Sequence, residues 1–307
     1  MFANRLPQFS PAPQSKHTQP ASPAPLLLEK RWGVHQTTTL RWSFKEDLLA
    51  FRDMGIGQVG VWRQKLDDVG LEKARELLRE TGIKAGSLSW AGGFTGTLGL
   101  SFDEAVADVK SALRMAHALE ASSLVVMTGG KGKLTPNHVR KVALEGLNKA
   151  GELAEILGVD LLVQPMHSRF NLDWSFLSDM EKCLDLMERL NHPSVGIALD
   201  IFALGHHPRF LDLLPQLMPF IRLVFLSDSG RKPRTDYDRR PLGQGTLPIM
   251  ETVAILEASG YQGRYEVQLM SEKSWGEDYQ ILLQEARRYM TQLERKPSTA
   301  RSAARSH

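Results

Sequence analysis

Asp200 ends an apolar run, residues 195–200, and is the strongest candidate for chemistry in this sequence. An ionised carboxylate at the end of a buried strand is costly unless a positive charge or several hydrogen-bond donors meet it. We therefore expect a functional role for Asp200. Gln164 and His167 lie three residues apart after another apolar run. His167 could work with Asp200 as an acid/base pair in catalysis.

Further polar and aromatic side chains follow other apolar runs. The candidates for substrate binding are His35, Trp62, Trp90, Gln164, Asp228, Arg239, Arg240 and Gln268. Arg239 and Arg240 belong to a group of five cations in residues 231–240, which two aspartates partly balance. This group predicts either an anion site or a solvated loop. Trp62, Trp90 and Trp275 could form an apolar wall against a sugar ring, or could simply pack.

The elements that must position these residues alternate regularly from residue 31 onward. Short apolar runs predict strands at 32–36, 58–62, 84–89, 123–128, 161–164, 195–200, 221–226 and 265–269. Segments of helical period separate them, and Ser43–Glu46, Ser101–Glu104 and Ser178–Glu181 have the spacing of capping boxes. Several strands are apolar almost throughout, as in sheets covered on both faces.

Eight such strand–helix units in about 260 residues predict a single (β/α)8 TIM barrel, an α/β fold. In this fold the reacting groups lie at the C-terminal ends of the strands, which is where the candidate residues fall. A doubly wound open sheet is the alternative. It is disfavoured because no glycine-rich dinucleotide motif follows the first strand.

The chain of 307 residues divides into a proline-rich leader at 1–30, the barrel at 31–294 and a basic tail at 295–307. Both ends are expected to be disordered, because they lack the apolar residues that would stabilise a fold. The two ends hold six positive charges and no acid at 1–28 and 295–307, so the formal net charge of +3 leaves −3 between them. A mildly acidic barrel argues against a nucleic-acid partner.

The sequence also bears on location. No apolar run approaches the roughly 18 residues of a membrane span, and the apolar stretch of a signal peptide is missing. The single cysteine, Cys183, cannot form an internal disulfide. These features predict a cytoplasmic protein with no membrane partner.

The order of the strand-end motifs resembles the xylose isomerase-like barrels of the sugar phosphate isomerase/epimerase superfamily. The resemblance covers about residues 32–290, and its motifs read HQTTTLRWS, GVWRQKLDDVGL, SLSWAGGF, QPMH, ALDIFALG, FLSD, RRPLGQG and YEVQL. The resemblance implies binding of a sugar, sugar phosphate or polyol at the C-terminal mouth of the barrel. Relatives often form dimers, so it also implies a homodimer.

Active members of that superfamily hold one divalent metal with a Glu, an Asp, a His and a second Glu. Carried over by motif, these positions fall on Gln164, Asp200, Phe225 and Gln268, so Asp200 alone matches. One carboxylate, two amides and a phenyl ring make a poor cage for Mg²⁺, Mn²⁺ or Zn²⁺. An amide also cannot accept a proton as a general base. The resemblance therefore implies no cofactor, unless a metal site has been rebuilt from other residues.

Three functions fit these patterns. The first is a carbohydrate-binding barrel that has lost the metal-dependent proton transfer, with Arg239 or Arg240 meeting an anionic group. The second is an active isomerase or epimerase with metal-free or shifted-metal chemistry at His167 and Asp200. The third is a barrel with an apolar-filled mouth that contacts only other proteins. If the scaffold is otherwise intact, restoring the three lost ligands together should recover metal binding.

Overall fold

The computed structural model describes residues 28–169 and 172–295. The expected leader and tail fall largely on residues 1–27 and 296–307, which lie outside these ranges. Parallel strands form a closed barrel in the order β1-β10-β7-β6-β5-β4-β3-β2. The strands are β1 Trp32–His35, β2 Gln58–Trp62, β3 Lys84–Gly92, β4 Ser123–Met127, β5 Asp160–Val163, β6 Val195–Asp200, β7 Ile221–Leu226 and β10 Arg264–Val267. The predicted TIM barrel is therefore confirmed.

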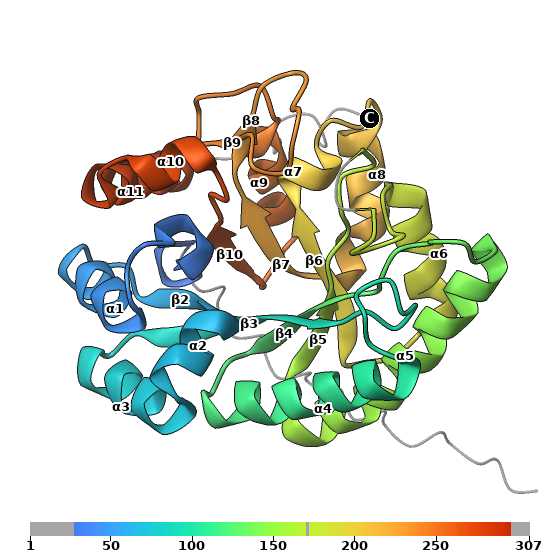
Figure 1. Ribbon diagram of the computed structural model, residues 1–307. Helices are drawn as coiled ribbons and strands as arrows, with labels where there is room; N and C mark the ends of the chain where they lie inside the picture. The colour runs from blue at the N-terminus through green and yellow to red at the C-terminus, as the bar shows by residue number, and fades with distance from the viewer. Residues whose placement is uncertain (1–27, 170–171, 296–307) are drawn as a thin grey trace, which may run out of the picture.

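Helices surround the barrel (Figure 1). The longer ones are α1 Phe44–Asp53, α3 Leu71–Thr81, α4 Phe102–Ala118, α5 Pro136–Leu157, α6 Met180–Leu190, α8 Phe210–Leu217, α9 Ile249–Ala258 and α11 Tyr279–Arg295. Short helices α2 Arg63–Val69 and α7 Ile201–Leu204 follow β2 and β6 directly, and a third, α10 Glu272–Gly276, begins shortly after β10. The main core lies between strands and helices. Within the described ranges, no helix is both long and apolar enough to cross a membrane.

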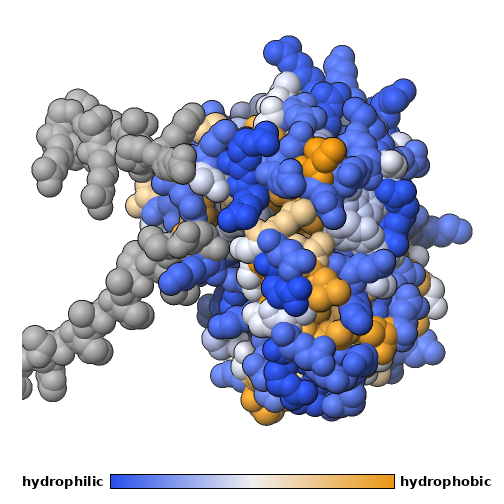
Figure 2. All heavy atoms as spheres, turned by 90° about the vertical axis from the view of Figure 1, so that its left-hand side faces the viewer, coloured by the Kyte–Doolittle hydropathy of each residue, from blue (hydrophilic) through white to orange (hydrophobic). Residues whose placement is uncertain are grey.

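The barrel interior contains a second, smaller apolar cluster that includes Val125, Leu162, Leu223 and Phe225, with Trp90 packed against it. Side chains thus fill the barrel centre, as is usual for this fold. The outer face over α1, α3 and α11 is mostly hydrophilic, with smaller hydrophobic areas between the polar side chains (Figure 2).

The segment after β7 differs from the expected loop. Residues Asp228–Ser229 (β8) and Arg239–Arg240 (β9) pair as an antiparallel hairpin. In Figure 1 this hairpin lies beside α7, which follows β6. The hairpin therefore returns the chain to the end of β6, where Asp200 is located.

Two of the three predicted capping boxes are present, at Ser43–Glu46 and Ser101–Glu104. The third prediction was wrong, because Asp179 rather than Ser178 accepts the hydrogen bond from the Lys182 backbone N–H, at 2.8 Å. Ser178 and Asp179 are adjacent and both residue types cap helices, so spacing alone favoured the residue that completed a box with Glu181.

Replacing the true cap should therefore cost more than replacing its neighbour. We expect Asp179→Ala to lower the free energy of unfolding by about 1 kcal/mol, the usual cost of a lost N-cap. Ser178→Ala is the matched control and should cost clearly less, since its hydroxyl accepts only from the exposed Lys182 Nζ. Urea denaturation of both variants checks this. A larger loss for Ser178→Ala would contradict the assignment of the cap.

Candidate functional site

Asp200 lies fully buried at the end of β6, and its charge is met by Arg239 from β9. The Arg239 guanidinium contacts both carboxylate oxygens, with Nη2 at 2.8 Å from Oδ2 and Nη1 at 3.1 Å from Oδ1. The backbone N–H of Phe202 donates a further hydrogen bond to Oδ1 at 3.0 Å. Asp200 therefore has the positive charge and the donors that its burial requires.

Arg239 is held from several sides. Its guanidinium also donates to Asp236 and to the Ser227 hydroxyl, both at 3.3 Å, and lies 4.4 Å from the centre of the Phe202 ring. Burial acts to lower the pKa of Arg239, but Asp200 and Asp236 more than offset this, and the pKa is raised. The site therefore contains a permanent, buried cation with two anionic partners.

Gln164 extends this network across the mouth of the barrel. Its Nε2 donates to Asp200 Oδ2 at 3.1 Å, and its Oε1 accepts the indole N–H of Trp90 at 2.7 Å. The Trp90 ring in turn lies 5.3 Å from the His35 ring, centre to centre. Arg239, Asp200, Gln164 and Trp90 thus form a continuous chain of hydrogen bonds at the ends of β3, β5 and β6.

His167 lies beside this chain, against the Phe202 and His206 rings at 5.9 and 5.8 Å. Burial lowers its pKa to about 4, with smaller contributions in the same direction from His206 and Arg169. The His167 imidazole is therefore neutral at pH 7. Its Nδ1 accepts a hydrogen bond from the Arg169 backbone at 3.2 Å.

Several buried polar groups lie deeper in the barrel. Gly60 leaves room for two of them, because a Cβ there would overlap both the Glu266 carboxylate and the His35 ring. Burial, with Lys65 and Arg239 nearby, lowers the pKa of His35 to about 3, whereas burial raises that of Glu266 to about 7. Among the described residues, no hydrogen-bond partner contacts His35 Nε2, Ser89 Oγ, Glu266 Oε1 or either side-chain polar atom of Gln268.

Asp228 and Arg240, two of the predicted substrate-binding residues, have contacts outside the hydrogen-bond network around Asp200. Asp228 accepts backbone N–H bonds from Ser229, Gly243, Gly245 and Leu247 at 2.8–3.1 Å, so its carboxylate holds the segment after the hairpin together. Arg240 is exposed and contacts the Gln244 carbonyl at 3.4 Å. Neither side chain is shown in contact with the Asp200 network.

An open pocket of about 530 Å³ lies beside Trp90. Its aromatic lining consists of Trp62 in β2 and Trp90 in β3, together with Trp174, Tyr237 and Trp275 from the segments that follow β5, β7 and β10. Trp174 and Tyr237 were not among the sequence candidates, because they lie well beyond the strand ends in long connections. Polar groups of Thr37, Gln64, Asp67 and Asp108 also line this aromatic pocket.

Arg63 connects the aromatic pocket to the barrel. Its guanidinium donates to the Trp90 carbonyl at 2.9 Å and to both carboxylate oxygens of Asp108 at 2.8 and 3.0 Å. Because the Arg63 guanidinium is ion-paired with the Asp108 carboxylate, Arg63 positions Trp90 rather than offering an unpaired positive charge to a ligand.

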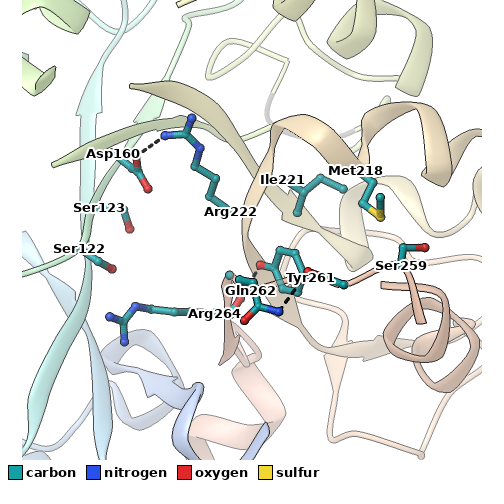
Figure 3. A pocket seen from close by; sticks show the side chains of 12 residues that line it. Ser122, Ser123, Asp160, Met218, Ile221, Arg222, Ser259, Tyr261, Gln262 and Arg264 are labelled. Carbon is teal, nitrogen blue, oxygen red and sulfur yellow. Dashed lines mark hydrogen bonds and ion pairs between the residues drawn. The ribbon is translucent and has the colours of Figure 1, made fainter. Parts of the chain in front are cut away.

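A second hollow, of about 440 Å³, lies at the opposite end of the barrel (Figure 3). It is lined by residues at strand starts, among them Ser123, Asp160, Ile221 and Arg264, and an ion pair joins Asp160 to Arg222. In TIM barrels this N-terminal face contributes to stability rather than to catalysis. The aromatic pocket at the C-terminal mouth is therefore the better candidate for ligand binding.

The model of the xylose isomerase-like TIM barrel family matches residues 48–290, and the chain belongs to this family. Protein SMc04130 from Sinorhizobium meliloti 1021 is 24% identical, with 85% of this chain and 98% of that chain covered and a TM-score of 0.77. The IolI protein with a bound zinc atom is 18% identical, with 86% and 98% covered and a TM-score of 0.76. D-psicose 3-epimerase from Clostridium cellulolyticum H10, solved with D-tagatose, is 14% identical, with 86% and 98% covered and a TM-score of 0.69. Among curated proteins, no sequence matches this chain.

Asp200 and Gln164, which correspond by motif to two of the family's metal ligands, have other partners in this structure. Both oxygens of Asp200 bind the Arg239 guanidinium, and Gln164 presents an N–H donor to the same carboxylate. Phe225 contributes a ring that packs in the barrel interior. Within residues 28–169 and 172–295, no three His, Cys, Asp or Glu side chains gather in a metal-binding group.

Proposed function

We propose that this chain binds a neutral sugar or polyol in the aromatic pocket, without a metal ion and without the metal-dependent proton transfer of its active relatives. The supporting observation is the composition of the pocket wall, which four of the six tryptophans of the chain line together with Tyr237. The apolar C–H faces of a sugar ring pack well on aromatic faces. The Asp67 carboxylate and the Gln64 amide offer acceptors and donors for hydroxyl groups.

The charges favour a neutral ligand over a phosphorylated one. Arg239, a predicted anion contact, is 1% exposed and bonded to Asp200 and Asp236. Arg63 is paired with Asp108, and Asp67 adds a negative charge to the pocket wall. A phosphate group would therefore meet carboxylates without an unpaired guanidinium to offset them.

Catalysis by Asp200 and His167 is not favoured by the geometry. The hydrogen bonds to Asp200 come from Arg239, Gln164 and the Phe202 backbone. A general base must be free to accept a proton from the substrate, and a carboxylate bound twice by a guanidinium is poorly placed to do so.

The exposed rim of the pocket supports a second candidate, a protein partner. Leu98, Trp174 and Tyr237 are 36%, 38% and 42% exposed, which is high for large apolar side chains that line one opening. Exposed apolar groups gathered in this way mark binding sites for ligands or for proteins. The sugar proposal is preferred because the pocket is concave and carries hydroxyl-binding groups.

Titration with neutral sugars and polyols, followed by tryptophan fluorescence and calorimetry, tests the proposal. We expect saturable binding that is unchanged by EDTA or added Mn²⁺. Trp275→Ala should weaken binding about tenfold, which corresponds to about 1.4 kcal/mol of lost contact. Trp42→Phe is the matched control, because Trp42 packs against Tyr279 and is not part of the pocket lining. Binding that requires Mn²⁺, or no response to any sugar, would contradict the proposal, and the second result would favour the protein partner.

A further inference from the structure

The Asp200 carboxylate is the one group that keeps its residue type among the family's four metal-binding positions. In this structure its two oxygens are bonded by the two terminal nitrogens of Arg239, in the parallel arrangement typical of a guanidinium–carboxylate pair. The side chains of Arg239 and Asp200 are 1% and 0% exposed. A cation is thus already present where a metal ion would need to bind.

The surroundings of Arg239 show a built site rather than a chance contact. Asp236 and Ser227 accept further hydrogen bonds from the guanidinium, and the Phe202 ring lies against its face. The β8–β9 hairpin fixes the backbone of Arg239, and the Asp228 carboxylate anchors the segment that follows. The guanidinium is therefore held by groups from several elements, as a bound metal ion would be.

The geometry points to Arg239 as the resident cation of this site. We infer that its guanidinium has replaced the metal ion and excludes a divalent cation, even from a site whose lost ligands have been restored. A dication placed beside a buried guanidinium would be repelled strongly, because the interior screens charge poorly. This inference does not depend on which ligand the aromatic pocket takes.

The replacement also explains the orientation of Gln164. With Asp200 accepting from Nε2, the amide must turn its Oε1 toward Trp90, where it accepts the indole N–H. A divalent cation would instead require oxygen atoms, not the Gln164 N–H, to face the centre of the site.

The test uses the triple variant Gln164→Glu, Phe225→His, Gln268→Glu, with Mn²⁺ binding measured by electron paramagnetic resonance and by metal analysis. We expect the triple variant with Arg239 present to bind no stoichiometric Mn²⁺, in contrast to the expectation from sequence that restoring the ligands suffices. Adding Arg239→Ala should produce one bound Mn²⁺. Adding Arg239→Lys, which keeps the charge, should leave the affinity at least about tenfold below that of the alanine background.

Each outcome decides the matter. Stoichiometric Mn²⁺ in the triple variant would overturn the inference, and so would equal Mn²⁺ affinity in the lysine and alanine backgrounds. Absence of Mn²⁺ from a cooperatively folded alanine background would also overturn it. If the alanine background does not fold, Arg239→Gln keeps hydrogen-bond donors without the charge and takes its place. Sugar titration of the unmodified protein is separate, so failure of the proposed function would be seen independently.

Discussion

Replacing Arg239 by methionine is expected to lower the free energy of unfolding by about 3–5 kcal/mol, because the change leaves a buried carboxylate without its counter-charge. Asp200 would keep the donors from Gln164 and the Phe202 backbone, but both are neutral. Urea denaturation followed by circular dichroism measures the loss. Arg240→Met is the control on the same strand, and this exposed side chain should change stability by no more than about 0.5 kcal/mol.

A double variant distinguishes the stability lost when the whole ion pair is removed from the stability lost when the Asp200 carboxylate is left unpaired. Asp200→Leu combined with Arg239→Met removes both charges, and we expect it to recover much of the stability lost by Arg239→Met alone. Full recovery is not expected, since Asp236 loses its partner as well. If Arg239→Met cost no more than Arg240→Met, the buried pair would not have the role that the structure assigns to it.

The second large effect concerns Glu266, whose carboxyl group is buried deep in the barrel. Burial raises its pKa from 4.5 to about 7, against the opposing effects of the Ser87 hydroxyl and Arg264. The folded protein therefore holds a proton here that the unfolded chain releases. The contribution of Glu266 to stability is most favourable below pH 4.5, falls as the pH rises to 7, and is constant above that, with a total change of about 3 kcal/mol.

Glu266→Gln should remove this loss. The variant is expected to be more stable than the unmodified protein by about 3 kcal/mol at pH 8, with the difference shrinking toward pH 4.5. The difference between the two proteins isolates Glu266 from His35, whose lowered pKa makes stability rise with pH over an overlapping range. Glu251→Gln, at an exposed position of α9, is the control and should follow the unmodified profile. A stability difference independent of pH would contradict the buried-acid explanation.

The fold could be predicted well because apolar runs carry its pattern. The bounds of β6 and β7 match the predicted runs, 195–200 and 221–226, and Asp200 lies at the strand end as expected. In a TIM barrel the C-terminal ends of the strands lie at one mouth, and this correctly predicted that Asp200, Gln164 and Trp90 lie close together there. The need of Asp200 for a positive partner was also foreseeable from its burial.

The partner itself could not be predicted. Arg239 is 39 residues from Asp200, on a two-residue strand whose pairing depends on a loop without periodicity. The sequence of that segment offered no basis for deciding which of its five cations pairs with Asp200. The buried one, Arg239, is neutralised by carboxylates and is therefore not available to bind an anion. Trp174 and Tyr237 were missed for a similar reason, because connections between strands and helices place side chains by their individual geometry and not by a repeating pattern.

The hairpin that carries Arg239 also carries Tyr237, which lines the aromatic pocket. Movement of this hairpin away from the pocket would separate the guanidinium from Asp200. The Asp200 carboxylate would then be left buried without a counter-charge. The buried ion pair between Arg239 and Asp200 therefore opposes movement of the hairpin on this side of the pocket. We therefore expect a ligand to enter without displacement of the hairpin, so that the existing opening limits the size of the ligands that the pocket admits.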